Sequence, residues 1–538
     1  MPAYGSSAIL TLPTCLTEAL RPCPMGSRAF GWFTMWRVKS LDAVLATAEK
    51  KSLHRSLGPV QLTMLGIGGV IGTGIFVLTA EAAQKAGPGM LLAFVIAGAV
   101  SAVAALCYAE LSSMVPVSGS AYTYSYAVLG EMVAWLVGWA LILEYAVAAS
   151  AVSVGWSGYI VGLLAHLPTP IIIPPALATG PYAGGVINVL AVLIALAVTC
   201  LLTIGTRESA TVNACLVAVK LVALSAFMWL ALPVMHMENF HPFAPLGTPG
   251  VIGAAASIFF AYVGFDAVST AAEETKNPQR NLPIGLIASL GICTVIYLLV
   301  AAGAIGSYGA QPVFGPHGET LAPGSMALQA QCASLASQPL VCSREALAHV
   351  LRSIHHPLVG NLLGLAAGIA LPTVILMMMF GQTRIFFVMS RDGLLPEGLS
   401  RVHPRFRTPH VVTWLTGIAV AFAAAFLPVG QLADISNSGT LFAFAAVSVA
   451  VMVLRHTQPD RPRPFRAPWI YLFGTLSVGG CLVLFFFLPW QAKLLFPIWA
   501  VIGLGFYYAY GYRHSHVGRG LTEVPELDSD APKGPIAN

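Results

Sequence analysis

The chain has 538 residues, of which 57% are hydrophobic and only 9% are charged, and its mean hydropathy is +0.78. A soluble globular protein carries roughly 25% charged residues. So few charges cannot cover so apolar an interior in water, which excludes a soluble enzyme and a nucleic-acid-binding protein. The composition predicts an integral membrane protein.

The apolar stretches are each about 20 residues long, which is the length of a helix that crosses ~30 Å of hydrocarbon. A membrane β-barrel would show strands of about ten residues with alternating polarity. Because lipid offers no partner for backbone polar groups, each apolar stretch should be helical. The predicted fold class is therefore an all-α polytopic membrane protein.

The N-terminal part is irregular, and residues 1–34 lack the pattern of a signal peptide. We expect translation to begin at Met35 and residues 1–34 to be a non-native or disordered extension. Residues 35–56 are basic and amphipathic, which predicts a cytoplasmic segment lying on the membrane surface.

The remaining chain predicts about twelve transmembrane helices, with approximate cores at 58–84, 89–113, 131–157, 184–205, 210–233, 250–272, 284–307, 358–386, 411–428, 435–454, 468–489 and 493–511. Residues 57–233 hold the first five, residues 250–455 the next five with a long outer loop at 309–356, and residues 468–512 the last two. Most Lys and Arg residues fall in alternate loops, so the positive-inside rule places both termini, with the tail at 513–538, in the cytoplasm.

Two of these helices carry signs of interruption at mid-membrane. The first contains GIGGVIGTGIF (66–76), and each glycine costs a helix roughly 1 kcal/mol relative to alanine. The sixth contains FFAYVGFDAVST (259–270), with Gly264 at its centre. Close packing through small residues is the alternative explanation. Paired interruptions in two inverted five-helix repeats indicate a binding site near the bilayer midplane.

Several motifs together resemble the amino acid–polyamine–organocation superfamily. They are GVIGTGIF, CYAEL, GWALILEYAVAASAVSVGWSGY, a lysine in the fifth helix, AYVGFDAVSTAAEETKNPQRNLPIG and GQTRIFFVMSRDGLLP. The resemblance covers roughly residues 35–512 and is nearest to bacterial relatives of the cationic amino acid transporters. It implies a five-plus-five inverted repeat with discontinuous helices 1 and 6 in the bacterial cytoplasmic (inner) membrane.

The resemblance also implies a substrate site at the two interruptions. The α-carboxylate of an amino acid would bind the N–H groups of Gly72, Thr73 and Gly74 and the Thr73 hydroxyl, at a positive helix end. The α-ammonium would bind carbonyls of the two breaks, and Phe260 would be an aromatic gate over the substrate. The residues assigned to the ammonium and its surroundings are Val70, Ile71, Phe260, Ala261 and Val263.

Lys220 lies in the middle of the fifth apolar stretch, where a lysine costs roughly 2.5–3.5 kcal/mol on insertion scales. By resemblance, its ammonium takes the place of a sodium ion and bridges helices one and eight, which makes it the candidate for proton coupling. A structural ion pair or a lysine that reaches a water cavity is the alternative.

Other residues in the apolar stretches have candidate roles. Glu144 is expected near the substrate side chain, and Met378 is either part of the pocket floor or an ordinary core methionine. We expect Asp266, with Gly264, to orient the sixth-helix break or cap the following half-helix, with gating as the alternative. Glu131 lies nearer the interface, where a gating or a structural role is open.

Cysteines and histidines give no metal-binding spacing, and no phosphate-binding loop occurs. Cys332 and Cys342 share the predicted outer loop and could pair in an oxidising compartment. We therefore expect no cofactor and no metal, with the proton gradient as the driving force.

The sequence thus predicts a secondary active transporter, not an enzyme, that carries an amino acid with a proton by alternating access. The alternatives are an amino acid or polyamine exchanger and, more remotely, a non-transporting amino acid sensor. The substrate side chain, the oligomeric state and a small accessory membrane helix as a partner remain open.

Overall fold

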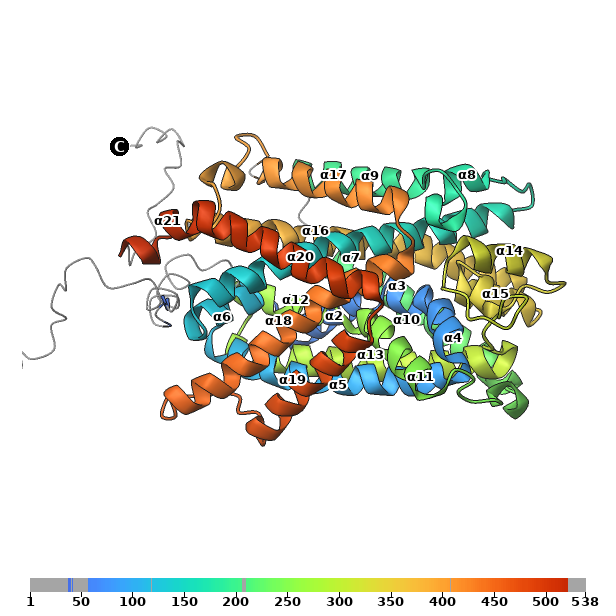
Figure 1. The fold of residues 1–538 in the computed structure, drawn as a ribbon, viewed down its shortest axis with the longest axis horizontal. Coiled ribbons are helices and arrows are strands. Elements are labelled where there is room, and N and C mark those ends of the chain that lie inside the picture. Colours follow the sequence, from blue (N-terminus) through green and yellow to red (C-terminus); the bar gives the residue numbers. More distant parts are fainter. Residues whose placement is uncertain are drawn as a thin grey trace, which may run out of the picture. The chain divides into compact units, whose positions relative to one another are not determined.

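The computed structural model of the chain describes residues 37–39, 41, 57–117, 119–205, 210–406 and 408–520 (Figure 1). The chain divides into two units, Met1–Met35 and Trp36–Asn538, and the described residues all belong to the second. The predictions for residues 1–34, for most of segment 35–56 and for most of the tail therefore lie outside the described residues.

The structure confirms the predicted all-α membrane fold. The first five spans are α2 (Pro59–Val70) with α3 (Thr73–Phe76) and α4 (Leu78–Ala86), then α5 (Met90–Met114), α7 (Glu131–Ala165), α9 (Val189–Ile204) and α10 (Ala210–Ala231). Among the described residues nine helical segments are long and apolar enough to cross a membrane, and α2, α9 and α17 are shorter apolar helices.

The second half of the chain supplies the remaining spans. They are α11 (Gly247–Ile258) with the 3-10 turn η6 (Phe259–Tyr262) and α12 (Ala267–Thr270), then α13 (Pro278–Tyr308), α16 (Pro357–Arg391), α17 (His410–Phe426), α18 (Val429–Thr457), α19 (Ile470–Phe487) and α20 (Trp490–Phe506). The first and sixth spans are each divided into shorter helices, as predicted.

Local sequence explains where several helices begin. Pro59 opens α2, where its missing N–H costs no helical hydrogen bond, and the Gln61 side chain accepts the Gly58 N–H at 3.1 Å. At the start of α9 the Asn188 side chain accepts the Ala191 N–H at 3.1 Å, which is a standard N-cap.

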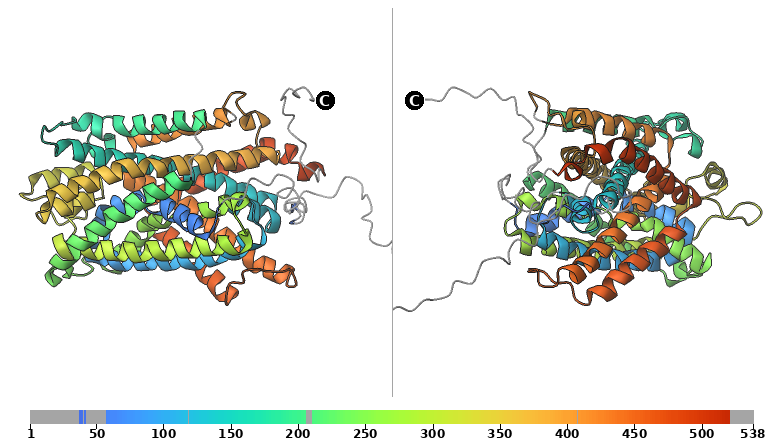
Figure 2. Two further views of the ribbon diagram at one scale, coloured as in Figure 1. Left: turned by 180° about the vertical axis from the view of Figure 1, so that it is seen from behind. Right: turned by 60° about the vertical axis from the view of Figure 1, so that its left-hand side comes forward.

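Long helices from the two halves interlock around the divided spans. The 35-residue helices α7 and α16 lie against each other, α18 also packs on α7, and α13 packs on both α2 and α5. Helices α9 and α17, far apart in sequence, lie side by side (Figures 1 and 2). The divided spans are thus enclosed by helices that contribute few charges.

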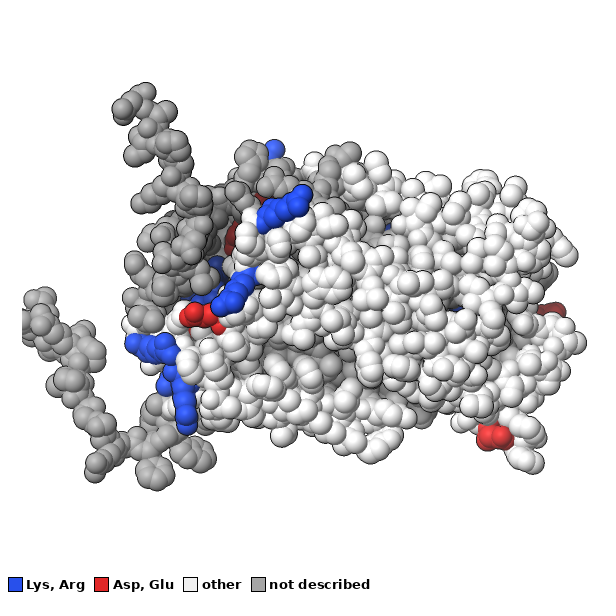
Figure 3. Space-filling model, turned by 90° about the horizontal axis from the view of Figure 1, so that it is seen from above, with Lys and Arg blue, Asp and Glu red and all other residues white. Residues whose placement is uncertain are grey.

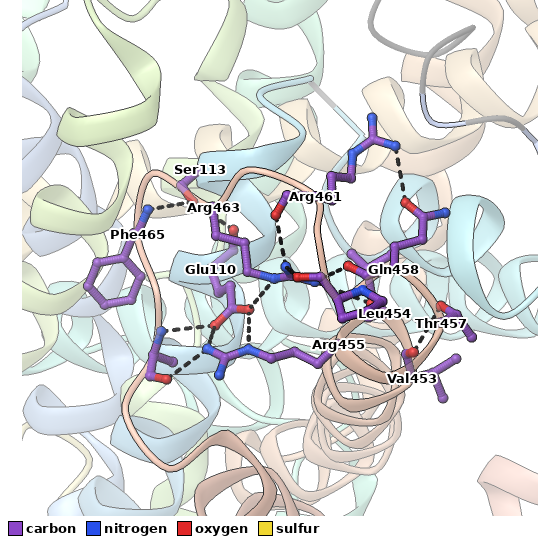
Figure 4. A network of polar contacts seen from close by, with 12 residues as sticks. Glu110, Ser113, Val453, Leu454, Arg455, Thr457, Gln458, Arg461, Arg463 and Phe465 are labelled. Atoms are coloured by element: carbon purple, nitrogen blue, oxygen red, sulfur yellow. Dashed lines mark hydrogen bonds and ion pairs between the residues drawn. The ribbon is translucent and has the colours of Figure 1, made fainter.

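On the face of the bundle that Figure 3 shows, Lys and Arg side chains gather at one end. We call it the basic end. There Glu110, at the end of α5, accepts hydrogen bonds from Arg455 Nε at 2.9 Å and Nη2 at 2.6 Å (Figure 4). Arg463 adds an ion pair at 3.3 Å, and the Ala467 N–H donates at 2.9 Å. This network ties α5 to α18 and the loop that follows it.

The opposite end carries the predicted outer loop, and we call it the loop end. This loop contains α14 (Met326–Ser334) and α15 (Ala346–Ser353). The structure joins Cys332 and Cys342 in a disulfide, with a Cα–Cα distance of 5.9 Å. Arg352 forms an ion pair with Glu345, which fixes α15 to the segment before it.

The two breaks touch each other through backbone atoms. A Cβ atom at Gly74 would overlap the Cα and Cβ atoms of Ala261. Gly264 has φ +114°, which favours glycine, and a Cβ there would lie 2.8 Å from the Gly69 carbonyl carbon. Glycine is therefore required at position 74 by space, and at position 264 by space and by conformation.

We predict that Gly74→Ala destabilises the protein, because the added methyl group forces the breaks apart. Overpacking of this kind costs about 1–3 kcal/mol in unfolding free energy, so the Tm of the protein in detergent should fall by several degrees. Gly291→Ala is the matched control, since a Cβ there meets open space. An unchanged Tm for Gly74→Ala would contradict the backbone contact.

Candidate substrate site at the helix breaks

The first break lies between α2 and α3. Ile71 (φ −74°, ψ 94°) and Gly72 (φ −147°, ψ −145°) leave the helical conformation, and α3 begins at Thr73. The N–H groups of Gly72, Thr73 and Gly74 therefore stand at a helix start, where no carbonyl of the same helix can accept them. These three residues are the ones assigned to a carboxylate from the sequence.

The Thr73 side chain is the most distinctive group at this break. It is 1% exposed, and its hydroxyl has no hydrogen-bond partner within the described residues. Opposite it stands Gly155 of α7, where a Cβ atom would lie 2.7 Å from Thr73 Cγ2 and 3.1 Å from its Oγ1. A buried hydroxyl without a partner is costly in a protein interior, and a bound polar group would remove that cost.

The second break begins in η6. Val263 is extended (φ −63°, ψ 138°), and its N–H donates to the Phe260 carbonyl at 3.2 Å. The Phe260 side chain is buried at 6% exposure. The predicted aromatic gate thus lies on the turn that enters this break, next to Ala261, which contacts Gly74 of the first break.

Tyr297 of α13 connects the two breaks. Its hydroxyl lies 2.7 Å from the Val70 carbonyl oxygen and 3.0 Å from the Ala261 carbonyl oxygen. The side chain is fully buried beside Phe94 and Tyr262. The sequence analysis missed this residue; the available signal was a tyrosine in an apolar helix, whose buried hydroxyl needs a partner.

Asp266 holds the second break to α7. Its carboxylate accepts the Tyr145 hydroxyl at 3.0 Å and the Gly264 N–H at 3.3 Å. Asp266 stands at the N-cap position of α12, but its side chain makes no capping hydrogen bond. These contacts are those of a residue that orients the break, no capping hydrogen bond is present, and the choice between this role and gating stays a prediction.

Glu144 is buried next to this group. Its side chain is 0% exposed, neither carboxylate oxygen has a hydrogen-bond partner in the described residues, and it interacts electrostatically with Asp266. Met378, predicted as part of the pocket floor or as a core methionine, is also buried on α16. However, Met377 is the methionine beside the first break, since a Cβ at Gly69 would lie 3.0 Å from its sulfur.

Lys220 reaches the first break from α10. Its ammonium donates to the Gly68 carbonyl at 2.9 Å, and the residue is 1% exposed. Gly68 permits this approach, because a Cβ there would lie 2.9 Å from Val217 of α10. Helix α10 also packs on α16, the eighth span, where the Thr373 hydroxyl donates to the Ala370 carbonyl of its own helix.

Glu131 lies at the basic end and not at the breaks. Its carboxylate accepts hydrogen bonds from Tyr126 at 3.0 Å, Tyr507 at 2.9 Å and Ser515, and Arg37 lies 3.7 Å away. Thirteen residues of α7 separate it from Glu144, which is roughly 20 Å of helix. These contacts correspond to the structural one of its two predicted roles. Among the described residues, no cluster of His, Cys, Asp or Glu is placed to hold a metal ion.

Comparison with known proteins identifies the family. A family model described as amino acid permease matches residues 57–507. The chain belongs to the amino acid permease family. It is a membrane transporter of this family and not an enzyme, and the family shows no cofactor.

Individual relatives of this permease cover nearly the whole chain. It is 43% identical to the branched-chain amino acid permease BcaP of Bacillus subtilis over 90% of its own length and 99% of the relative's. It is 41% identical to the methylthioribose transporter of the same organism, again over 90% and 99% of the two lengths. It is 35% identical to the vacuolar cationic amino acid transporter 4 of Arabidopsis thaliana, over 79% and 67%.

We predict that Thr73→Val weakens amino acid binding, because the variant keeps the shape of the side chain and removes the hydroxyl. The affinity should fall by about 1–3 kcal/mol, as for a lost hydrogen bond to a charged group. Thr79→Val is the matched control: Thr79 is also buried in this span, but its hydroxyl donates to the Ile75 carbonyl. Equilibrium binding in detergent measures both variants. Unchanged affinity of Thr73→Val for every amino acid would remove Thr73 from the site.

Proposed function

We propose that this permease carries an α-amino acid into the cell together with a proton, by alternating access. The observation that carries the proposal is the pair of touching breaks, with the buried Thr73 hydroxyl and the helix-start N–H groups on one side and backbone carbonyls on the other. Donors beside acceptors match the carboxylate and the ammonium of one zwitterion.

Within this site we assign the carboxylate to Gly72, Thr73 and Gly74. The ammonium lies against the carbonyl oxygens of both breaks, which belong to Val70, Ile71, Phe260, Ala261 and Val263. Phe260 covers the substrate, and Glu144 and Met378 face its side chain. The basic end is the cytoplasmic one, since Lys and Arg gather there (Figure 3), and the membrane is the bacterial inner membrane.

The relatives' names differ in the cargo they give. One is named for branched-chain amino acids, one for cationic amino acids and one for methylthioribose, which has neither an α-carboxylate nor an α-ammonium. Overall identity therefore does not choose among these cargoes. The proposed contacts are to the α-carbon groups, so they select the class of α-amino acids and leave the side chain to other residues.

Uptake into proteoliposomes tests this function. We expect purified protein to concentrate at least one of the common amino acids when the interior is made alkaline, and to stop when an ionophore removes the pH difference. A rate that ignores the pH difference but rises with internal amino acid would show an exchanger instead. Binding without flux would show a sensor.

Lys220 is the proposed coupling group, because its protonated ammonium fixes the Gly68 carbonyl beside the first break. Loss of the proton removes this charge and loosens the inner half of the first span. We predict that Lys220→Ala abolishes accumulation driven by a pH difference while substrate binding persists. Lys220→Arg should not restore accumulation, since a guanidinium stays charged. Lys493→Ala, at a half-buried lysine near the start of α20, should behave as wild type.

A persistent proton-driven accumulation in Lys220→Ala would place the coupling group elsewhere. Glu144 would then be the next residue to substitute, because its carboxyl group is fully buried and interacts electrostatically with Asp266 of the second break.

A further inference from the structure

A cavity lies at the loop end, next to the first break. Its volume is about 290 Å³, near the lower end of the ~300–1,000 Å³ usual for small-molecule sites. Val77, which directly precedes α4, and Gly155 of α7 line it, and Gly155 also contacts Thr73. The cavity therefore adjoins the break on the side of the disulfide-bearing loop, and both Cys332 and Cys342 belong to its lining.

A carboxylate faces this cavity from α4. Glu81 lines the cavity and is only 8% exposed, and no hydrogen bond or ion pair within the described residues engages it. The nearby Lys85 is already bound to Ser257 and lies 3.2 Å from Asp434. Lys85 attracts the Glu81 carboxylate electrostatically, but no hydrogen-bond donor within the described residues engages it.

A guanidinium faces the same cavity from the loop. Arg344 lines the cavity, and its Nη1 donates a hydrogen bond to the Ala178 carbonyl at 3.3 Å. No carboxylate within the described residues is paired with it. Burial lowers the pKa of Arg344 from its ordinary value, because desolvation disfavours the charged form. An anionic group beside Arg344 would offset this desolvation cost.

Glu81 of α4 lies at about the same height in the bundle as Gly158 of α7, and the loop residue Arg344 packs against Gly158. Gly155 contacts Val77, since a Cβ there would lie 3.1 Å from Val77 Cγ2. One turn further along each helix come Glu81 and Gly158, and Arg344 Cβ lies 3.1 Å from where a Cβ of Gly158 would be. An acceptor and a bidentate donor therefore face one small buried volume from two walls.

We propose that this cavity is a second substrate subsite, in which Glu81 binds the ammonium and Arg344 the carboxylate of an incoming α-amino acid. The proposal rests on the proposed amino acid transport and adds a place where the substrate waits before it reaches the breaks. The Cys332–Cys342 disulfide restrains the loop residues that form one wall of this subsite, because both cysteines belong to that wall.

Uptake and binding of L-leucine and L-arginine by the full chain test the subsite. Glu81→Gln and Arg344→Gln should each raise the KM for uptake about fivefold or more, with the maximal rate changed less than about twofold. Equilibrium binding in lipid nanodiscs should fall from two molecules per chain to one. The controls are Glu319→Gln and Arg466→Gln, which alter exposed side chains and should match wild type.

Gln329→Trp provides an independent variant, because Gln329 lines the cavity from the loop and touches neither break in the proposed mechanism. The added indole should fill the cavity and reproduce the rise in KM, so the test holds even where a charge-removing variant fails to fold. One molecule bound per wild-type chain, with an unchanged KM in the variants, overturns the subsite and leaves the transport function standing. Neither uptake nor binding of any common amino acid by wild type overturns both proposals.

Discussion

A helix interrupted inside a membrane leaves backbone groups that neither lipid nor the next turn can satisfy. The rest of this structure follows from how those groups are bonded. Lys220 donates to the Gly68 carbonyl, Tyr297 lies against the Val70 and Ala261 carbonyls, and Asp266 accepts the Gly264 N–H. Lys220 comes from α10 and Tyr297 from α13, whereas Asp266 belongs to the second break itself. The divided spans are therefore stable only inside the complete bundle.

Sequence reasoning predicted the breaks, because glycine clusters and a lone lysine are unusual in apolar runs and each carries a physical cost. It did not predict Tyr297, which lies 227 residues from Val70 in the chain. A tyrosine in an apolar helix shows that its hydroxyl needs a partner, but the partner depends on which helices become neighbours. The same limit applies to the methionines of α16: the sequence does not show which of them contacts the first span, and the structure places Met377 against Gly69, with Met378 buried beside it in the chain.

The buried carboxyl groups show how depth and neighbours set a role that residue type alone does not. Glu110 and Glu131 lie at the basic end among arginine, tyrosine and serine donors, and they join segments distant in sequence. Glu144 lies deep in α7 without a hydrogen-bond donor in the described residues. A carboxylate that accepts several hydrogen bonds joins the segments that donate them, whereas a buried carboxylate without a donor can still bind a ligand or a proton.

The contact of Tyr297 with both breaks has a stoichiometric consequence. A phenol carries one hydrogen, so at any instant it completes a hydrogen bond to one of the two carbonyls and leaves the other incomplete. An ammonium group carries three hydrogens and could serve both oxygens together. In the proposed site, a substrate amine would supply the hydrogen that Tyr297 cannot give to the second of these carbonyls.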